Sequence, residues 1–187
     1  SIGVPVAIGA VAVIGLPRWL RTKFVPPQRD QPHVPEDVGL NAEEVWLTAV
    51  DGASLRAWHI PQPKPAPLLV VIHGWGGNAS LMLPVGPILF EAGYSLLVLD
   101  ARNHGGSDHT DHMSMPRFAQ DIDVALDWAA DLPDSLSLGL LGHSIGAGAS
   151  ILSCSRRSDL SAVVAVGAFS HPWELMREAP TIARMPR

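Results

Sequence analysis

The sequence predicts an α/β protein in which helices cover both faces of a mostly parallel sheet. Short, unbroken apolar runs recur along the chain, and segments of helical character lie between them. A strand that is buried on both faces has this continuous apolar pattern, and strands that alternate with helices pair in parallel through crossover connections. We therefore expect a doubly wound sheet preceded by an antiparallel hairpin.

The strands are expected in two groups. Residues 44–49 and 54–60 flank Asp51-Gly52, a dipeptide that tolerates the positive φ of a type I′ hairpin turn. The apolar runs at 68–72, 95–99, 136–141 and 162–166 predict buried strands. These two groups form the hairpin and the parallel part of the sheet.

Helices are expected at about 80–91, 116–131 and 144–153. The middle helix has a clear apolar stripe, which consists of Phe118, Ile122, Ala125, Leu126 and Ala129. Its aspartates, Asp121, Asp123, Asp127 and Asp131, are expected to turn mostly away from that stripe.

Composition restricts the classes of function. The chain has 187 residues, of which 47% are hydrophobic and 17% charged, and its net charge is -5. It can fill a core, but it has no surplus of basic residues to neutralise a phosphate backbone, so a nucleic-acid partner is not expected. The single cysteine, Cys154, excludes an internal disulfide and a multi-cysteine zinc site.

The first residues differ from the rest of the chain. Residues 2–16 are apolar and uncharged, and Arg18, Arg21 and Lys23 follow them directly. Because about 20 apolar residues span a bilayer, we expect a hydrophobic membrane-anchor helix within residues 1–23, although the visible stretch is short. The basic residues favour a main domain on the cytoplasmic side of the membrane. The alternative is a buried or interfacial helix of the folded domain.

The remaining chain divides into two parts. Residues 24–43 are rich in proline and are expected to form a stiff linker, and residues 44–187 are expected to form the folded domain.

A candidate nucleophile follows one of the predicted strands. Gly142-His143-Ser144-Ile145-Gly146 fits the pattern G-x-S-x-G and lies between a strand and a helix of small residues. The glycines permit a sharp turn that raises the serine oxygen above the sheet, and the start of the helix supplies backbone N–H groups. Ser144 is therefore the predicted nucleophile. The alternative is a structural turn whose glycines only allow close packing.

A glycine-rich loop, His73-Gly74-Trp75-Gly76-Gly77-Asn78, follows the strand at 68–72. It can direct the backbone N–H of Trp75 toward Ser144, where it would complete an oxyanion hole with the N–H of Ile145. We expect His73 to be structural rather than a base. The alternative for this loop is a simple chain reversal.

The strand at 95–99 leads into a segment, residues 100–108, that is expected to be structural. Arg102 and Asp108 are predicted to form hydrogen bonds that brace neighbouring loops. His109 and His112 lie near Asp108 and Asp111, but their spacing matches no strong metal-ligand pattern, and no metal or cofactor is expected.

With these motifs in this order, residues 44–171 resemble the α/β-hydrolase superfamily. The apolar N-terminus, the hairpin D-G-x-x-L-R-A-W, the H-G-W-G-G-N loop and D-A-R-N-H-G-G-S-D look like bacterial membrane-associated hydrolases of the esterase/lipase-like or acyl-peptidase-like branch. The resemblance implies a serine hydrolase of esters or amides with Ser144 as nucleophile and Trp75 and Ile145 as oxyanion donors. A small acyl ester or a lipid-like molecule is the implied substrate.

The sequence departs from this superfamily after Ser144. The superfamily order is Ser, then Asp or Glu, then His, on later strand ends. The residues after Ser144 supply one predicted strand and a tail, so the sheet is expected to lack its C-terminal strands. We expect the chain to be a fragment without the acid and the histidine of a triad. His171, or less favourably His104, is the alternative base. A non-catalytic binding scaffold and an acyltransferase are the alternative functions.

Overall fold

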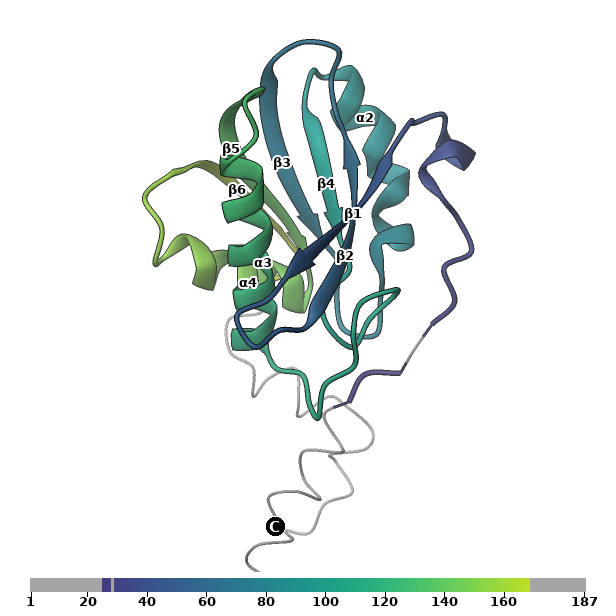
Figure 1. Cartoon of the computed structure of the whole chain (residues 1–187), viewed down its shortest axis with the longest axis vertical. Helices are drawn as coiled ribbons and strands as arrows, with labels where there is room; N and C mark the ends of the chain where they lie inside the picture. The colour runs from purple at the N-terminus through teal and green to yellow at the C-terminus, as the bar shows by residue number, and fades with distance from the viewer. Residues whose placement is uncertain (1–24, 28, 169–187) are drawn as a thin grey trace, which may run out of the picture.

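The computed structural model describes residues 25–27 and 29–168. Within them one sheet has the strand order β1-β2-β4-β3-β5-β6 (Figure 1). β1 pairs with β2 and β2 with β4 in antiparallel fashion, whereas the pairs β3–β4, β3–β5 and β5–β6 are parallel. The strands are β1 Glu43–Thr48, β2 Ser54–Ile60, β3 Ala66–Ile72, β4 Ser95–Leu99, β5 Ser135–His143 and β6 Leu160–Val166.

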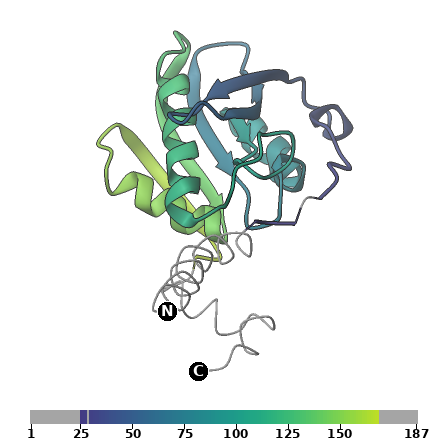
Figure 2. The ribbon, with the colours of Figure 1, turned by 60° about the horizontal axis from the view of Figure 1, so that its bottom comes forward.

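Helices lie on both sides of this sheet (Figures 1 and 2). The long helix α3 and helix α4 pack side by side on one face, and the short helices η2 and α2 lie on the other. A further short helix, η1, precedes β1. The bounds are η1 Pro35–Val38, η2 Ala79–Val85, α2 Gly86–Glu91, α3 Met115–Ala130 and α4 Ile145–Cys154.

The core has two parts, one on each face of the sheet. Neighbouring residues of a central strand belong to different parts: Val70 packs with the cluster under α3, and Val71 packs with the cluster under η2. Leu140 and Leu141 of β5 divide in the same way. Since side chains alternate across a strand, this division explains why most residues of the central strands are apolar. The predicted doubly wound, mostly parallel sheet with its leading hairpin is therefore confirmed.

Two local expectations were wrong. The hairpin between β1 and β2 turns through residues 50–52, and only Gly52 has positive φ (84°), so the turn is not type I′. The helix expected at about 80–91 is split into 3-10 helix η2 and α-helix α2. Pro84 lies inside η2 and lacks the N–H that an α-helical turn would use there.

Helix α3 confirms its predicted apolar stripe, because all five of those side chains are fully buried. Asp121 is an exception to the expected polar face, since it is also fully buried. Its carboxylate is paired with Arg102, which provides the partner that a buried charge needs. Among the other predicted outward aspartates, Asp127 and Asp131 are exposed and Asp123 is half-buried.

The segment before β1 is fastened to the domain. Asn78 donates hydrogen bonds from Nδ2 to the carbonyl oxygens of Arg29 (3.2 Å) and Asp30 (3.0 Å). The backbone N–H of His33 donates to Oγ of Ser80. We call residues 29–33 the strap, because they cross the loop that follows β3.

No helix in the described part of the chain is long and apolar enough to cross a membrane. The predicted anchor at residues 2–16 lies outside the described residues, as does the whole of segment 1–23.

Strand β6 forms the edge of the described sheet on the side opposite β1, and its residues Val164 and Val166 are about half exposed.

Candidate active site

A cavity of about 490 Å³ opens at the carboxyl ends of β3 and β5. These two strands are neighbours, but the chain goes from β3 to β4 on one side before it returns to β5 on the other. In an open α/β sheet such a reversal leaves a crevice that binds ligands. The lining includes Ser144, its neighbour His143, the loop after β3, several apolar side chains and Arg29.

Ser144 lies in the sharp turn between β5 and α4. Its backbone has φ 55° and ψ -119°, a conformation that costs energy for any residue with a Cβ. The N–H of Ser144 donates to the carbonyl oxygen of Val166 at 2.9 Å, which ties the turn to β6. The strained turn thus presents Ser144 at the cavity.

Two glycines allow this turn to fit. A Cβ on Gly142 would be 2.5 Å from the carbonyl oxygen of Gly146, and a Cβ on Gly146 would be 2.4 Å from the carbonyl oxygen of His73. Both distances are too short for a side chain, so these positions accept only glycine without a backbone shift. The G-x-S-x-G pattern therefore has a direct steric explanation.

The loop after β3 lies against the serine. A Cβ on Gly74 would be 3.0 Å from Cβ of Ser144, so the two backbones are in close contact. Trp75, the next residue, lines the cavity, and Ile145 is the first residue of α4. The backbone N–H groups of Trp75 and Ile145 donate to no acceptor within the described residues. Two free donors are thus available beside Ser144.

His73 and His104 form a buried pair behind this loop, with ring centroids 4.8 Å apart. In each ring Nε2 accepts a backbone N–H, from Ala101 for His73 and from Gly76 for His104. In each ring Nδ1 lies 2.8 Å from a backbone carbonyl oxygen, to which it donates. Both rings are therefore neutral, with the proton on Nδ1.

Burial reinforces this neutral state. It lowers the pKa of His73 to about 4, and burial together with the neighbouring His73 lowers the pKa of His104 to about 4. With all of their ring nitrogens engaged, neither histidine can take a proton from Ser144. The expectation that His73 is structural is confirmed, and His104 as an alternative base was wrong.

Asp100 follows β4 and organises the surrounding loops. Its carboxylate accepts the N–H of Ala79 at 2.6 Å and that of Gly106 at 3.0 Å. Nε2 of Gln31 in the strap also donates to it at 2.6 Å, and Arg56 lies 3.4 Å away. Burial raises the pKa of Asp100, while these donors oppose the shift. Asp100 therefore holds the strap, η2 and the loop after β4 together.

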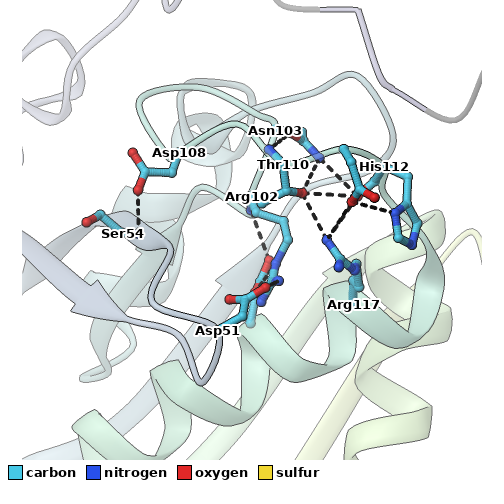
Figure 3. Close-up of polar contacts among 10 residues, drawn as sticks. Asp51, Ser54, Arg102, Asn103, Asp108, Thr110, His112 and Arg117 are labelled. Atoms are coloured by element: carbon cyan, nitrogen blue, oxygen red, sulfur yellow. Dashed lines mark hydrogen bonds and ion pairs between the residues drawn. The ribbon is translucent and has the colours of Figure 1, made fainter. Parts of the chain in front are cut away.

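The same loop is braced on its other side, as Figure 3 shows. Arg102 donates from Nε and Nη2 to Oδ1 of Asp121 at 2.8 and 2.6 Å, and from Nη1 to Oδ2 of Asp51 at 2.5 Å. Oδ2 of Asp108 accepts the N–H of Ser54 at 2.8 Å. The predicted bracing roles of Arg102 and Asp108 are confirmed, and both side chains tie the loop to the β1–β2 hairpin (Figure 3).

The structure brings Ser144 and Trp75 to one cavity and Ile145 to the turn beside it. His171 lies outside the described residues. No histidine of the described chain is hydrogen bonded to Ser144, and no group of three metal-ligating side chains occurs among the described residues.

Sequence reasoning missed two parts of the cavity lining. One is Arg29, and the other is an apolar wall formed by η2, which consists of Leu81, Met82, Pro84 and Val85. The apolar pattern of η2 could have indicated the wall, but no local signal marks Arg29.

Comparison with curated proteins finds relatives that are mostly longer than this chain. A serine hydrolase-like protein of Dictyostelium discoideum is 31% identical over 116 residues, which are 62% of this chain and 32% of that protein. The sn-1-specific diacylglycerol lipase ABHD11 of Xenopus tropicalis is 37% identical over 83 residues, 44% of this chain and 25% of the lipase. The chain thus spans between about a third and a half of the length of the first relatives that it matches.

Solved structures with the same fold include esterases. The esterase Pf2001 of Pyrococcus furiosus has a TM-score of 0.72 and 25% identity, over 78% of this chain and 56% of the esterase. Est1E of Butyrivibrio proteoclasticus, solved with ferulic acid, has a TM-score of 0.66 and 24% identity, over 71% of this chain and 56% of Est1E.

A protein-family model described as "Serine aminopeptidase, S33" matches residues 63–185, which is more than half of the chain. This range contains the loop after β3, the loop after β4 and the turn at Ser144. The chain therefore belongs to this serine aminopeptidase family of the α/β-hydrolase superfamily.

Proposed function

We propose that this protein hydrolyses carboxylic esters through an acyl-enzyme formed on Ser144. The observation that carries the proposal is the strained backbone of Ser144, with φ 55°, at a cavity opposite a glycine-rich loop. Strain of this kind persists where the surrounding structure fixes it, and it often serves function. The family match, the esterase structures and the lipase relative support the same class of reaction.

The reaction would proceed in two steps. Oγ of Ser144 attacks the carbonyl carbon of the ester, and the serine proton passes to a general base. The N–H groups of Trp75 and Ile145 donate to the oxyanion that develops on the carbonyl oxygen. The alcohol leaves with a proton and an acyl-serine forms, and water then releases the acid and restores the serine. We assign the general base to a residue outside the described range, because His73 and His104 are committed to backbone groups.

The substrate that we propose is an ester with an apolar acyl group. Leu81, Met82, Pro84 and Val85 line the cavity together with Trp75, and they offer an apolar surface beside the serine. An apolar wall binds an acyl chain by removing it from water. The name of one relative, a diacylglycerol lipase, is consistent with an ester of this type.

The test is covalent labelling of the full chain with a fluorophosphonate, followed by mass spectrometry of the labelled peptide. We expect a single adduct on Ser144 and loss of that adduct in Ser144→Ala. Ser155→Ala is the matched control, since Ser155 is an exposed serine near the end of α4 and its removal should leave labelling unchanged.

Hydrolysis is measured in parallel with p-nitrophenyl butyrate. Folded protein that is neither labelled nor hydrolytic would contradict the proposal and favour a binding scaffold. An adduct that persists in Ser144→Ala would show that another residue is the nucleophile.

A further inference from the structure

We propose that Arg29 makes this cavity selective for ester substrates that carry an anionic group, either a carboxylate or a phosphate. The inference rests on the proposed esterase function and specifies its substrate class. It depends on three features: the place of Arg29 at the cavity, the attachment of the strap that carries it, and the charges that surround it.

Arg29 reaches the cavity from a distant part of the sequence. It lines the same cavity as Ser144, although most of the domain separates the two residues along the chain. Its side chain is exposed, so it can meet a ligand that enters from solvent. Arg29 therefore contributes a solvent-accessible charge to the cavity that Ser144 also lines.

The strap is held in place by buried groups on the domain. Asn78 is fully buried, and its Nδ2 donates to the carbonyl oxygen of Arg29 itself at 3.2 Å. Two residues further on, Gln31 donates to the buried carboxylate of Asp100 at 2.6 Å and accepts a hydrogen bond from Arg56. The backbone at Arg29 thus has a defined position relative to the cavity, which a free linker would not provide.

The charge of Arg29 is not balanced within the described chain. Its guanidinium forms no ion pair or hydrogen bond there, and no aspartate or glutamate among the described residues lines the cavity. His73, the buried histidine of the lining, is neutral because its Nδ1 donates to a carbonyl oxygen and its Nε2 accepts an N–H. A permanent cation therefore stands beside a mainly apolar wall.

This combination suits a particular kind of ligand. A guanidinium presents a planar set of donors that matches the two oxygens of a carboxylate or of a phosphate. Apolar surroundings strengthen the attraction by lowering the local dielectric constant. An ester that has an apolar chain and an anionic group would bury the chain against the wall and place its charge near Arg29.

Binding and catalysis can be tested separately. Binding is measured by calorimetry on Ser144→Ala, which cannot turn over its ligand, with monomethyl suberate and its neutral counterpart dimethyl suberate. A second pair, 1-octanoylglycerol 3-phosphate and 1-octanoylglycerol, places the charge on the alcohol side. The two pairs distinguish a carboxylate on the acyl group from a phosphate on the leaving group. Hydrolysis of all four esters is measured with the protein that retains Ser144.

We expect the anionic member of at least one pair to bind about fivefold more tightly, as one partly exposed charge pair allows, and this preference to decrease with added salt. Arg29→Gln should remove the preference, and Arg29→Lys should retain most of it. Lys64→Gln is the matched control, because Lys64 is exposed and lies before β3, at the end opposite the cavity.

Equal binding within both pairs, or a preference that survives Arg29→Gln, would overturn the inference whether or not the esters are hydrolysed. Anion-selective binding without hydrolysis of any ester would contradict the proposed function and leave the role of Arg29 intact.

Discussion

The backbone N–H of Gly76 donates to Nε2 of His104 across 3.1 Å, and this bond joins the loop after β3 to the loop after β4. Gly76 has φ 64° and follows Trp75, whose N–H is a proposed oxyanion donor. The ring of His104 also packs on His73 and Phe118, with centroid distances of 4.8 and 5.1 Å. We therefore assign His104 as a positioning residue for the oxyanion loop.

The first prediction concerns this bond. His104→Phe keeps a ring of similar size but leaves the buried N–H of Gly76 without an acceptor, so we expect the rate of fluorophosphonate labelling of Ser144 to fall about tenfold. His104→Gln offers an amide oxygen as acceptor and should recover part of the rate. If both variants lose thermal stability equally and label at the wild-type rate per folded molecule, the bond supports the fold alone.

The second prediction concerns acid pH. The pKa values of His73 and His104 are about 4 in the folded protein, below the ordinary value of 6.5, so the unfolded chain binds protons first as the pH falls. The stability that the folded protein gains from keeping these two rings neutral is therefore complete above about pH 6.5 and declines as the pH falls below that value. At pH 5 we expect a loss of about 2 kcal/mol for each histidine in the free energy of unfolding, relative to pH 7.

Urea unfolding at several pH values measures this loss. Burial raises the pKa values of Asp100 and Asp121, so their protonation favours the folded state as the pH falls and opposes part of this loss. His104→Gln should remove about half of the loss, whereas His33→Gln, at an exposed position of the strap, should leave it unchanged. A stability that does not vary between pH 7 and pH 5 would show that the two rings are not neutral donors.

The third prediction compares two glycines near the serine. In Gly146→Ala the new Cβ would be 2.4 Å from the carbonyl oxygen of His73 and 3.0 Å from that of Ile72. Because these contacts are with backbone atoms, no side-chain movement can relieve them. We expect it to lower the free energy of unfolding by about 3 kcal/mol or more. In Gly74→Ala the corresponding contact is 3.0 Å, to Cβ of Ser144, so the cost in stability should be smaller while labelling of Ser144 slows. Equal stability of the two variants would contradict this steric account.

The sequence was informative where a structural cause is local. The bounds of β4, residues 95–99, agree with the predicted strand, and its four apolar side chains, residues 96–99, alternate between the two apolar cores. The turn at Ser144 was also predictable, because a sharp strand-to-helix connection requires glycine at fixed positions. Both features leave a pattern within a few residues of the sequence, although the contacts that require the pattern include distant segments such as His73.

The rest depends on contacts between distant segments. Asp121 is buried because Arg102, from another element, neutralises it, and a helical pattern taken alone places a carboxylate on the polar face. The sequence of the strap predicts a proline-rich linker, and its attachment appears only in the structure, where Asn78 donates to its backbone and Asp100 accepts a hydrogen bond from Gln31. Arg29 joins the cavity only through that attachment, so no pattern around residue 29 could have indicated it.

The last prediction tests the buried ion pair that holds the loop after β4. Oδ1 of Asp121 accepts hydrogen bonds from both Nε and Nη2 of Arg102, and Oδ2 accepts one from the backbone N–H of Arg102 at 2.9 Å. Asp121→Asn would leave the guanidinium buried with only the partly exposed Asp51 as counter-charge. We expect the free energy of unfolding to fall by about 3–5 kcal/mol, measured by urea denaturation.

Asp127→Asn is the control on the same helix. Asp127 pairs with Arg157 at 2.6 Å, but its side chain is 70% exposed, so its replacement should cost about 1 kcal/mol or less. Replacing both buried partners together, as Arg102→Met with Asp121→Leu, should recover much of the stability, because no uncompensated charge remains. If Asp121→Asn cost no more stability than Asp127→Asn, the ion pair would not be what fixes the loop after β4. His104 lies in that loop and donates from Nδ1 to the carbonyl oxygen of Arg102, so its position would then have to depend on its ring contacts with His73 and Phe118.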